Sequence, residues 1–372
     1  MNKFSAENMS GMSGMSGMSG MSGMITMDFT NAANTFAGYS GAISNPLLYG
    51  AMDLSRQYAS PAHAPDPVEP AKYPTSSQPA YLQQNDARTR FHLLTQECLE
   101  GLRLVSPQPG NGPLEVQLQY VGSPWAVLKR PEINTFGSQA KLVLARRAER
   151  PERMAEIISQ VTPQFAFWAS ICNLHPERNR YTIELAFVLL HVTMQLVQRI
   201  KHELACPRPA AWSADVQPCI QTPAYFSWPS GHATEAFFFA SLMSHLRPNR
   251  VWQNERLHAL AHRIADNRVV AGLHFPIDTP PGQFLGHRLA AYFAARAGNE
   301  GPGPRQVDCW SLAGDMLPMN SNPEISRAND SGIHLLEGSG VTRGVNGGFV
   351  IEVEESKSLH WLWHKAQEEI SY

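Results

Sequence analysis

The sequence has little excess charge, few cysteines and no long uninterrupted apolar run, and each shortage excludes a class of protein. Its 372 residues carry 30 lysines and arginines against 32 aspartates and glutamates, so the formal net charge is −2. A chain this close to neutrality offers no bulk attraction to nucleic acid or to an anionic membrane surface. We therefore expect a small-molecule substrate and no nucleic-acid partner, and any anion site has to be local.

Cysteine is scarce and scattered. The 5 cysteines show no CxxC spacing, and their odd number excludes a complete disulfide framework. This usage favours a reducing compartment.

The longest apolar stretch, residues 183–197, is interrupted by Glu184, His191 and Gln195. A membrane-spanning helix needs about 20 predominantly apolar residues, so we expect no membrane span. Lys3 near the N-terminus is not followed by the apolar core of a secretory signal. The protein is therefore expected to be cytoplasmic or otherwise soluble, and its oligomeric state stays open.

Low-complexity sequence occupies the first part of the chain. Five copies of Met-Ser-Gly span residues 9–23, and the sequence up to residue 85 is rich in Ser, Ala, Pro, Asn and Gln. This composition cannot bury enough apolar surface to order a chain. Residues 1–85 are therefore predicted to be a mostly disordered extension.

Helical apolar spacing dominates residues 86–300. After Pro151, apolar residues recur at i, i+3, i+4 and i+7 from Met154 to Val161. Further helices are expected near residues 91–102, 141–149, 165–172, 182–204, 230–240, 254–271 and 282–297. Residues 114–121 alternate with period two, which is typical of an isolated strand or a hairpin arm. We therefore expect a mainly α fold, a helical bundle that forms the catalytic domain.

Residues 301–372 are predicted to be a small irregular tail. Asn346-Gly347 between short apolar pieces indicates a hairpin, and residues 359–370 have the spacing of a short amphipathic helix.

The most informative stretch is Pro229-Ser230-Gly231-His232, which leads into an apolar helical run. A hydroxyl residue at the N-cap followed by Gly and His places free backbone N–H groups and an imidazole at a helix N-terminus, where an oxyanion is favoured. We expect Ser230 and Gly231 to contact an oxyanion and His232 to act as acid or base. Tyr225, shortly before this turn, either shapes the mouth of the pocket or belongs to the core, and Trp228 has the same two interpretations.

Two further clusters supply cations. Lys201 is followed after six residues by Arg208-Pro209, and Arg268 precedes His274 by six positions. Arginine forks to two oxyanion oxygens and lysine acts as a point charge. Lys201, Arg208 and Arg268 are therefore candidate oxyanion ligands, and all of the motifs lie within residues 201–278.

His274 is the candidate nucleophile or metal ligand. It follows Gly272, which ends the preceding helix, and Asp278 comes four residues later. A carboxylate at that spacing holds one ring nitrogen as N–H and leaves the other as a lone pair.

Taken together, these motifs resemble those of the phosphatidic acid phosphatase type 2 and vanadium haloperoxidase superfamily. That superfamily shows Lys-x6-Arg-Pro, then Pro-Ser-Gly-His, then Ser-Arg-x5-His-x3-Asp. The chain departs from the pattern at Asn267, where the superfamily usually has serine. Asparagine still donates a hydrogen bond, so the departure puts little in doubt. The resemblance covers about residues 140–300 and implies a helical bundle of the acid phosphatase and vanadium haloperoxidase type.

The resemblance implies one pocket with two chemistries. In the phosphatase members, the residue equivalent to His274 forms a phosphohistidine, the one equivalent to His232 protonates the leaving alcohol, and no cofactor is needed. In the haloperoxidase members, vanadate is the cofactor, its vanadium is bound through the equivalent of His274, and peroxide and halide are the substrates.

Choosing between these chemistries rests on fold-level analogy. The lipid phosphatases of the superfamily have several membrane spans and the secreted acid phosphatases carry signal peptides, so we favour the soluble haloperoxidase-like branch. Hydrolysis of phosphate monoesters is the alternative, and a non-catalytic anion-binding protein is the third interpretation.

Overall fold

The computed structural model describes residues 46–59, 79–106, 114–161, 164–298, 305–317 and 340–371. Its central element is α8 (Arg180–Leu204), which is apolar on nearly every side and therefore lies inside the helical layer. The other helices are α3 (Pro46–Tyr58), α4 (Ala87–Leu99), α5 (Thr135–Ala145), α6 (Arg150–Ser159), α7 (Phe165–Cys172), α9 (Pro209–Trp212), α10 (Gly231–Leu246), α11 (Val251–Val270), α12 (Thr279–Arg296) and α13 (Lys357–Ile370). Short 3₁₀ helices are η2 (Pro79–Gln84), η3 (Arg147–Glu149), η4 (Ala214–Val216), η5 (Pro276–Asp278) and η6 (Gly314–Met316).

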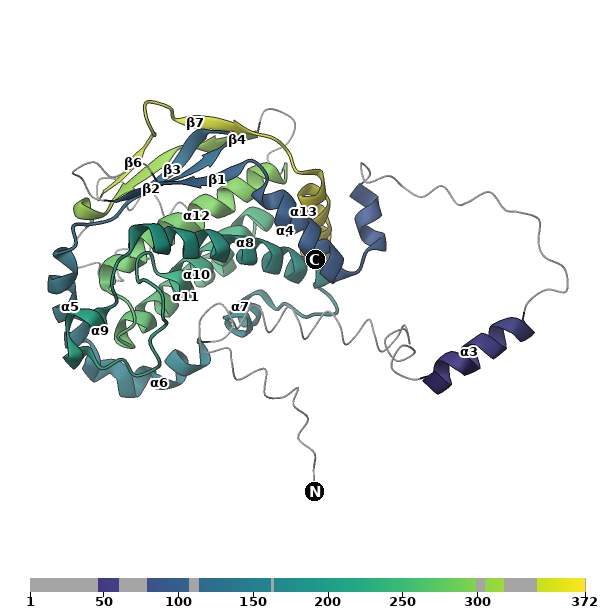
Figure 1. The fold of residues 1–372 in the computed structure, drawn as a ribbon, viewed down its shortest axis with the longest axis horizontal. Coiled ribbons are helices and arrows are strands. Elements are labelled where there is room, and N and C mark those ends of the chain that lie inside the picture. Colours follow the sequence, from purple (N-terminus) through teal and green to yellow (C-terminus); the bar gives the residue numbers. More distant parts are fainter. Residues whose placement is uncertain are drawn as a thin grey trace, which may run out of the picture.

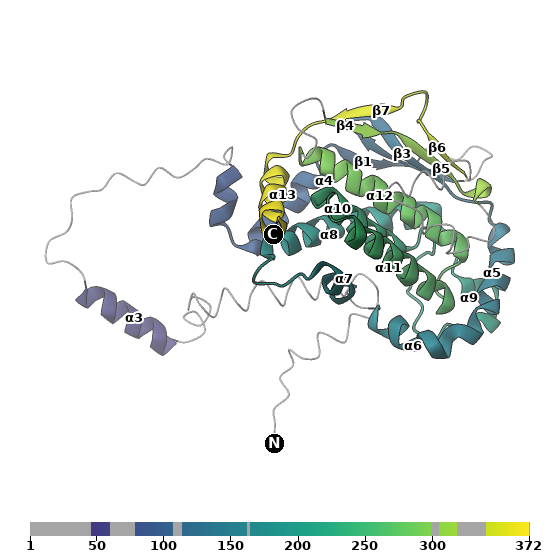
Figure 2. The same ribbon diagram turned by 180° about the vertical axis from the view of Figure 1, so that it is seen from behind.

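These helices confirm the prediction of a mainly α fold. Those expected from apolar spacing in residues 86–300 are present, with ends displaced by a few residues. α10, α11 and α12 lie side by side in Figure 2, below the sheet.

A β-sheet that the sequence interpretation did not foresee covers one side of the helical layer (Figure 1). Its five strands lie in the order β1 (Leu102–Val105), β2 (Glu115–Tyr120), β3 (Ser123–Lys129), β5 (Trp310–Ala313) and β6 (Val341–Arg343). A separate two-stranded sheet is formed by β4 (Arg305–Asp308) and β7 (Val350–Val353). The period-two stretch is therefore a strand, as predicted, but β2 pairs with strands on both sides.

The sheet is fixed to the helices by aromatic packing. The ring of Trp125 on β3 stacks on the ring of Tyr292 on α12, with 4.9 Å between centroids and an interplanar angle of 6°. Both side chains are fully buried, so this contact excludes water between the two layers.

The C-terminal residues are part of the same folded unit, which the expected division at residue 301 did not anticipate. β5 pairs in parallel with β3, and α13 packs against α8. The turn at Asn346-Gly347 forms as predicted, with Val345 bridged to Gly348. However, the strands on its two sides pair with β5 and β4, because these longer-range partners are available.

α10 and α12 approach closely where α12 carries glycine. A Cβ added at Gly282 would lie 2.8 Å from the Cβ of Ala233 and 2.8 Å from the carbonyl oxygen of Ser230. One added at Gly286 would lie 2.7 Å from the backbone nitrogen of Phe238. The two glycines therefore set the position of the first turns of α10.

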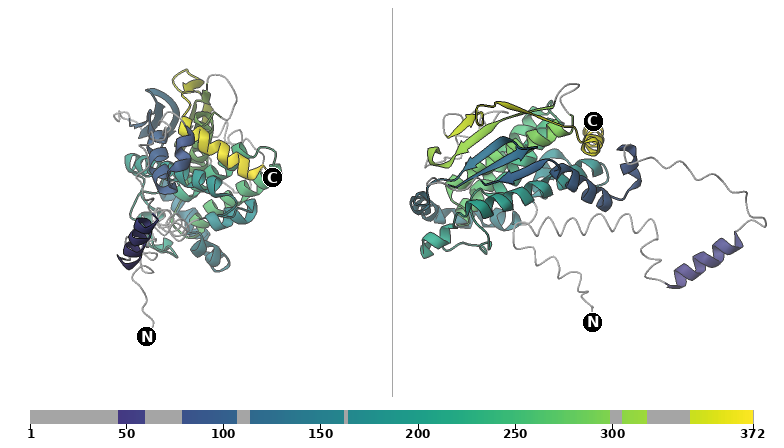
Figure 3. Two further views of the ribbon diagram at one scale, coloured as in Figure 1. Left: turned by 90° about the vertical axis from the view of Figure 1, so that its right-hand side faces the viewer. Right: turned by 45° about the horizontal axis from the view of Figure 1, so that its top comes forward.

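α3 lies within the extension that was predicted to be mostly disordered. It stands apart from the other described elements in Figure 1 and in the right-hand view of Figure 3, and residues 50–59 are exposed. Residues 79–85 are also ordered, because η2 lies there and its Leu82 is buried. The remainder of that prediction, including the Met-Ser-Gly repeats, falls on residues 1–45 and 60–78, outside the described residues.

One stretch of the described residues, Arg180–Trp212, is long and apolar enough to cross a membrane, although the sequence interpretation expected it to fall short. In the fold, 78% of its most apolar window is buried inside the protein. Its Glu184 carboxylate is buried and accepts two hydrogen bonds of 2.7 Å from Arg90. Burial of this kind is typical of a core helix, so the stretch is weak evidence for a span.

Candidate active site

The Pro-Ser-Gly-His stretch forms the predicted helix N-terminus. Ser230 is the N-cap of α10, and its hydroxyl accepts a hydrogen bond from the backbone N–H of Ala233 at 3.4 Å. The Ser230 N–H donates to the carbonyl of Asp278 at 2.9 Å, which ties this turn to the third motif. The peptide bond between Trp228 and Pro229 is cis.

Gly231 is the first residue of α10. A Cβ at this position would meet no atom closer than the methyl group of Met194, at 3.5 Å, and Cε of Lys201, at 3.9 Å. These are ordinary contacts, so the fold does not require glycine here.

Lys201 lies in the last turns of α8 and is buried. Its ammonium group donates to three backbone carbonyls, those of Phe226 at 3.1 Å, Ser227 at 2.7 Å and Pro229 at 2.5 Å. Burial, with the nearby Arg208 charge, lowers its pKa well below the ordinary value. Its donors are therefore engaged, and Lys201 acts on the site by holding the loop before α10 and by its charge.

Arg208 spans the distance between the first and third motifs. Its Nε donates to the carbonyl of Tyr225 at 2.9 Å, and its Nη1 donates to the carbonyl of Leu273 at 2.8 Å and contacts Nε2 of His274 at 3.0 Å. Its Nη2 is buried without a hydrogen-bond partner. Burial lowers the pKa of this guanidinium, yet arginine stays protonated at neutral pH.

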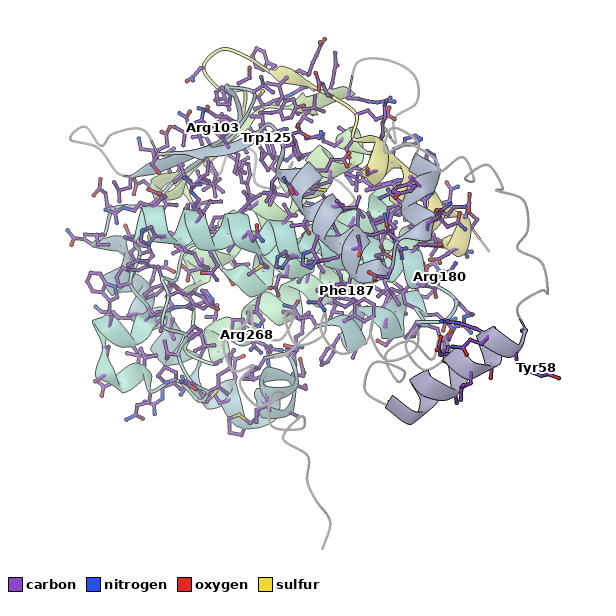
Figure 4. All side chains as sticks on the ribbon, turned by 45° about the vertical axis from the view of Figure 1, so that its right-hand side comes forward. Tyr58, Arg103, Trp125, Arg180, Phe187 and Arg268 are labelled. Carbon is purple, nitrogen blue, oxygen red and sulfur yellow. The ribbon has the colours of Figure 1, made fainter. Side chains whose placement is uncertain are left out.

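Arg268 is fully buried near the end of α11, and Figure 4 shows it in the helical layer, well away from Trp125 on the sheet. Its Nη2 donates to the carbonyl of Ile157 at 2.8 Å and to Oε1 of Gln160 at 3.4 Å. Its Nε and Nη1 have no partner. Burial lowers its pKa to about 10, so the charge persists at neutral pH.

His274 and Asp278 form the predicted pair. Nδ1 of His274 lies 2.8 Å from Oδ2 of Asp278, which also accepts from the Phe275 N–H at 3.0 Å and from the Ser227 hydroxyl. A carboxylate only accepts and a guanidinium only donates, so Nδ1 carries the proton and Nε2 presents its lone pair to Arg208.

Electrostatics keep His274 neutral. Burial, followed by the charges of Arg208 and Lys201, lowers its pKa well below the ordinary value. Burial raises the pKa of Asp278 to about 6, against the opposing hydrogen bond from Ser227, so Asp278 is mainly ionised at neutral pH. A neutral imidazole with an oriented lone pair is the state that a nucleophile or a metal ligand requires.

His232, in the first turn of α10, is partly exposed. Its Nε2 lies 3.1 Å from the carbonyl oxygen of Gln160, so Nε2 donates and Nδ1 keeps the lone pair. Burial of the ring, followed by the Arg268 charge, lowers its pKa to about 3. It is neutral in the free protein and gains a proton only when an anion offsets the neighbouring cations.

The site contains more positive than negative charge. Lys201, Arg208 and Arg268 are all buried, and Asp278 is the carboxylate that interacts with them most directly. Burial raises the pKa of the nearby Glu235 to about 8, so this carboxyl is mostly protonated at neutral pH. The arrangement is therefore suited to an anion with more than one negative charge.

Three residues of the site were missed by sequence reasoning. Ser227 donates to Asp278, Gln160 contacts His232 and Arg268, and Glu235 accepts from Gln164 at 2.7 Å. Ser227 and Glu235 lie within three residues of the Pro-Ser-Gly-His stretch, which is a signal that sequence offers. Gln160 lies at the end of α6, and no local pattern marks it.

The structure also distinguishes the two interpretations, pocket mouth or core, that the sequence left open for Tyr225 and Trp228. Trp228 is fully buried and belongs to the core. The ring of Tyr225 is partly exposed and lies against Arg208, 5.0 Å from ring centroid to Cζ, and near Lys201. Cys206 is buried, and all five cysteines are unpaired.

Asn267, the departure from the superfamily pattern, points into the contact between α11 and α6. Its Nδ2 donates to Glu156 and to Gln160, both at 2.9 Å, and its Oδ1 accepts from Arg153 at 3.0 Å.

A tetrahedral oxyanion fits these residues. Among the buried side chains that the structure describes, the arginines with an unpaired terminal Nη nitrogen are Arg208 and Arg268, both from the motifs. Within the same residues, no three His, Cys, Asp or Glu side chains are grouped to hold a metal ion. His274 Nε2 is the atom available to coordinate vanadium if vanadate is the bound oxyanion.

Fold and site together define a helical domain whose buried cations and oriented, neutral histidine are suited to an oxyanion. Residues 182–300 match the family model of the PAP2 superfamily, the superfamily that the motifs resemble. The match spans all of the predicted site residues. A comparison with curated proteins gave no match. Members of this superfamily are generally enzymes, among them phosphatases and haloperoxidases.

Proposed function

We propose that the pocket binds a tetrahedral oxyanion and that the protein is a soluble vanadate-dependent haloperoxidase. The observation that carries the oxyanion is the set of unpaired, buried arginine nitrogens: Nη2 of Arg208 with Nε and Nη1 of Arg268. A buried polar group without a partner costs about 1–3 kcal/mol, and more when it is charged. An oxyanion relieves that cost for both arginines at once.

Each residue has a role that its contacts support. Arg208 and Arg268 would hold the oxyanion oxygens, together with the hydroxyl of Ser230 and the N–H of Gly231 at the start of α10. Nε2 of His274 would exchange its 3.0 Å contact with Arg208 for the central atom of the oxyanion. His232 would take up and release the proton.

The burial of the site favours the haloperoxidase reaction. His274 is 3% exposed and Arg268 is 0% exposed, and hydrogen peroxide and halide ions are small enough to reach such a site without an organic group having to fit. Bound vanadate would supply the group at which peroxide is activated to oxidise the halide. Asp278 would keep the His274 ring oriented.

The test is to run two assays on one preparation. Protein loaded with orthovanadate is expected to brominate or iodinate a phenolic dye in the presence of peroxide, and His274→Ala is expected to abolish this while the fold is retained. The haloperoxidase proposal is wrong if loaded protein shows no halide-dependent oxidation while vanadate-free protein hydrolyses p-nitrophenyl phosphate. Full activity in His274→Ala would refute the site assignment.

Hydrolysis of phosphate monoesters is the second candidate, and the partial exposure of His232 favours it. Nε2 of His274 would attack phosphorus, the bond from phosphorus to the ester oxygen would break, and His232 would give its proton to the departing alcohol. Water would then cleave the bond from phosphorus to nitrogen and release phosphate. This reaction needs no cofactor. If neither assay gives a signal while the oxyanion binds, the non-catalytic anion-binding function replaces both.

A further inference from the structure

Gln160 is positioned to act on two functional residues at once. It follows the last residue of α6 and is 1% exposed. Its carbonyl oxygen accepts from Nε2 of His232, and its side-chain Oε1 accepts from Nη2 of Arg268. It lies outside all three motifs, and the packing of α6 brings it to His232 on α10 and to Arg268 on α11.

The neutral amide suits the contact with Arg268. Gln160 Oε1 and the Ile157 carbonyl restrain Nη2 without neutralising the guanidinium, and Nε and Nη1 stay unpaired. A carboxylate in the place of this amide would form an ion pair with Arg268. It would then compete with any oxyanion for the same charge.

The carbonyl contact sets the state of His232. Because a carbonyl only accepts, it holds the proton on Nε2 and leaves the lone pair on Nδ1. The ring orientation therefore depends on where the end of α6 lies relative to α10.

Asn267 fixes Gln160 in turn. Its Nδ2 donates to Oε1 of Gln160 and to Oε2 of Glu156, both at 2.9 Å. A serine hydroxyl has one proton to donate and could make only one of these two bonds. The asparagine that departs from the superfamily pattern thus makes two of the contacts that hold the end of α6 against α11.

We propose that Gln160, held by Asn267, is a positioning residue that fixes Arg268 and His232 for the oxyanion. This inference rests on the proposed oxyanion pocket. It assigns a role to a part of the chain that precedes the matched region of residues 182–300, and it explains why this chain uses asparagine at position 267.

The experiment measures orthovanadate binding by calorimetry for wild type, Gln160→Ala, Gln160→Glu and Asn267→Ser, with unfolding midpoints without ligand. We expect at least a tenfold loss of affinity for Gln160→Glu at pH 8 that shrinks as the pH is lowered to about 5, because protonation of the introduced carboxyl frees Arg268. For Gln160→Ala and Asn267→Ser we expect a three- to tenfold loss of orthovanadate affinity relative to wild type.

Gln253→Ala and Gln253→Glu are the matched controls. Gln253 is a partly buried glutamine on α11 whose amide donates to the Ile171 carbonyl at 3.3 Å, outside the motifs. These variants are expected to bind vanadate as wild type does, whatever their unfolding midpoints.

The outcomes separate the two proposals. If folded wild type binds neither orthovanadate nor phosphate, the proposed function fails and this inference fails with it. If wild type binds and Gln160→Glu binds equally well at every pH, Gln160 has no positioning role although the pocket stands. If Gln160→Ala does not fold, the pH dependence of Gln160→Glu and the affinity of Asn267→Ser decide the question.

Discussion

The close contact between α10 and α12 makes Gly282→Ala a sharp test of how the oxyanion site is built. The added Cβ would lie 2.8 Å from both the Ala233 Cβ and the Ser230 carbonyl oxygen, about 0.6 Å short of an ordinary contact. Both of these atoms belong to backbone or to a side chain that cannot rotate away. The helices must therefore separate at the N-cap of α10.

The magnitudes for stability and for function differ. Overpacking lowers the free energy of unfolding by about 1–3 kcal/mol. The higher helix propensity of alanine relative to glycine raises it by up to about 1 kcal/mol. We expect a net loss of roughly 0–2 kcal/mol, which lowers the unfolding midpoint by a few degrees. A displacement approaching 1 Å at a catalytic group costs up to about a hundredfold in rate, so we expect a ten- to hundredfold loss of oxyanion affinity or kcat/KM.

Gly137→Ala is the matched control. Gly137 lies in α5, and its added Cβ would approach nothing closer than the Trp212 ring at 3.5 Å. This variant should keep full function and unfold at the same temperature or slightly higher. The reasoning is refuted if Gly282→Ala matches Gly137→Ala in orthovanadate affinity, in kcat/KM and in unfolding midpoint.

Three further variants test single groups. Gly231→Ala should fold as wild type does, because its Cβ meets only ordinary contacts, but should bind orthovanadate at least tenfold more weakly, and unchanged binding would contradict the assigned pocket. Asp278→Asn should lower kcat by a thousandfold or more, of the order seen when a catalytic histidine is given the wrong tautomer, and a loss below tenfold would show that Asp278 does not set the tautomer. Because burial raises the pKa of Glu235 from an ordinary 4.5 to about 8, the folded state keeps a proton that the unfolded state has lost between these values. Wild-type stability should therefore fall as pH rises from about 4.5 to 8, by up to about 1.4 kcal/mol per pH unit. Glu235→Gln should flatten this slope and raise the unfolding midpoint at pH 8, and an unchanged slope in thermal unfolding would count against a buried, protonated Glu235.

The sequence predicted those features that depend on neighbouring residues. The start of α10 follows from a hydroxyl N-cap and the residues after it, and the His274–Asp278 pair follows from a four-residue spacing. Local rules of this kind need no knowledge of the rest of the chain.

The features that were missed depend on contacts between distant segments. β3 pairs with β5, although the two strands are separated by most of the helical domain. The carbonyls that surround Lys201 come from a loop of irregular backbone, whose path no periodicity encodes. The sequence around Gln160 carries no motif, and its contacts with the site exist only because α6 packs against α11. In each case the signal lies in tertiary packing.

Buried arginines show how structure separates a supporting role from a functional one. Arg150 is buried like Arg208 and Arg268, and its partners are three backbone carbonyls, those of Val270, Gln217 and Val216. All three of its nitrogens are used, so it supports the loop before Gly272 and has no nitrogen left for a ligand. Arg208 and Arg268 differ in having terminal nitrogens without partners.

The unpaired nitrogens have a thermodynamic consequence. The free protein holds Arg208 and Arg268 in a buried site without a full set of partners, and this state is unfavourable. A ligand that binds only the folded state stabilises it, by about 2.7 kcal/mol when its concentration is 100 times Kd. An oxyanion that satisfied both arginines would therefore stabilise this domain as well as occupy its site, because the same unpaired donors would account for both effects.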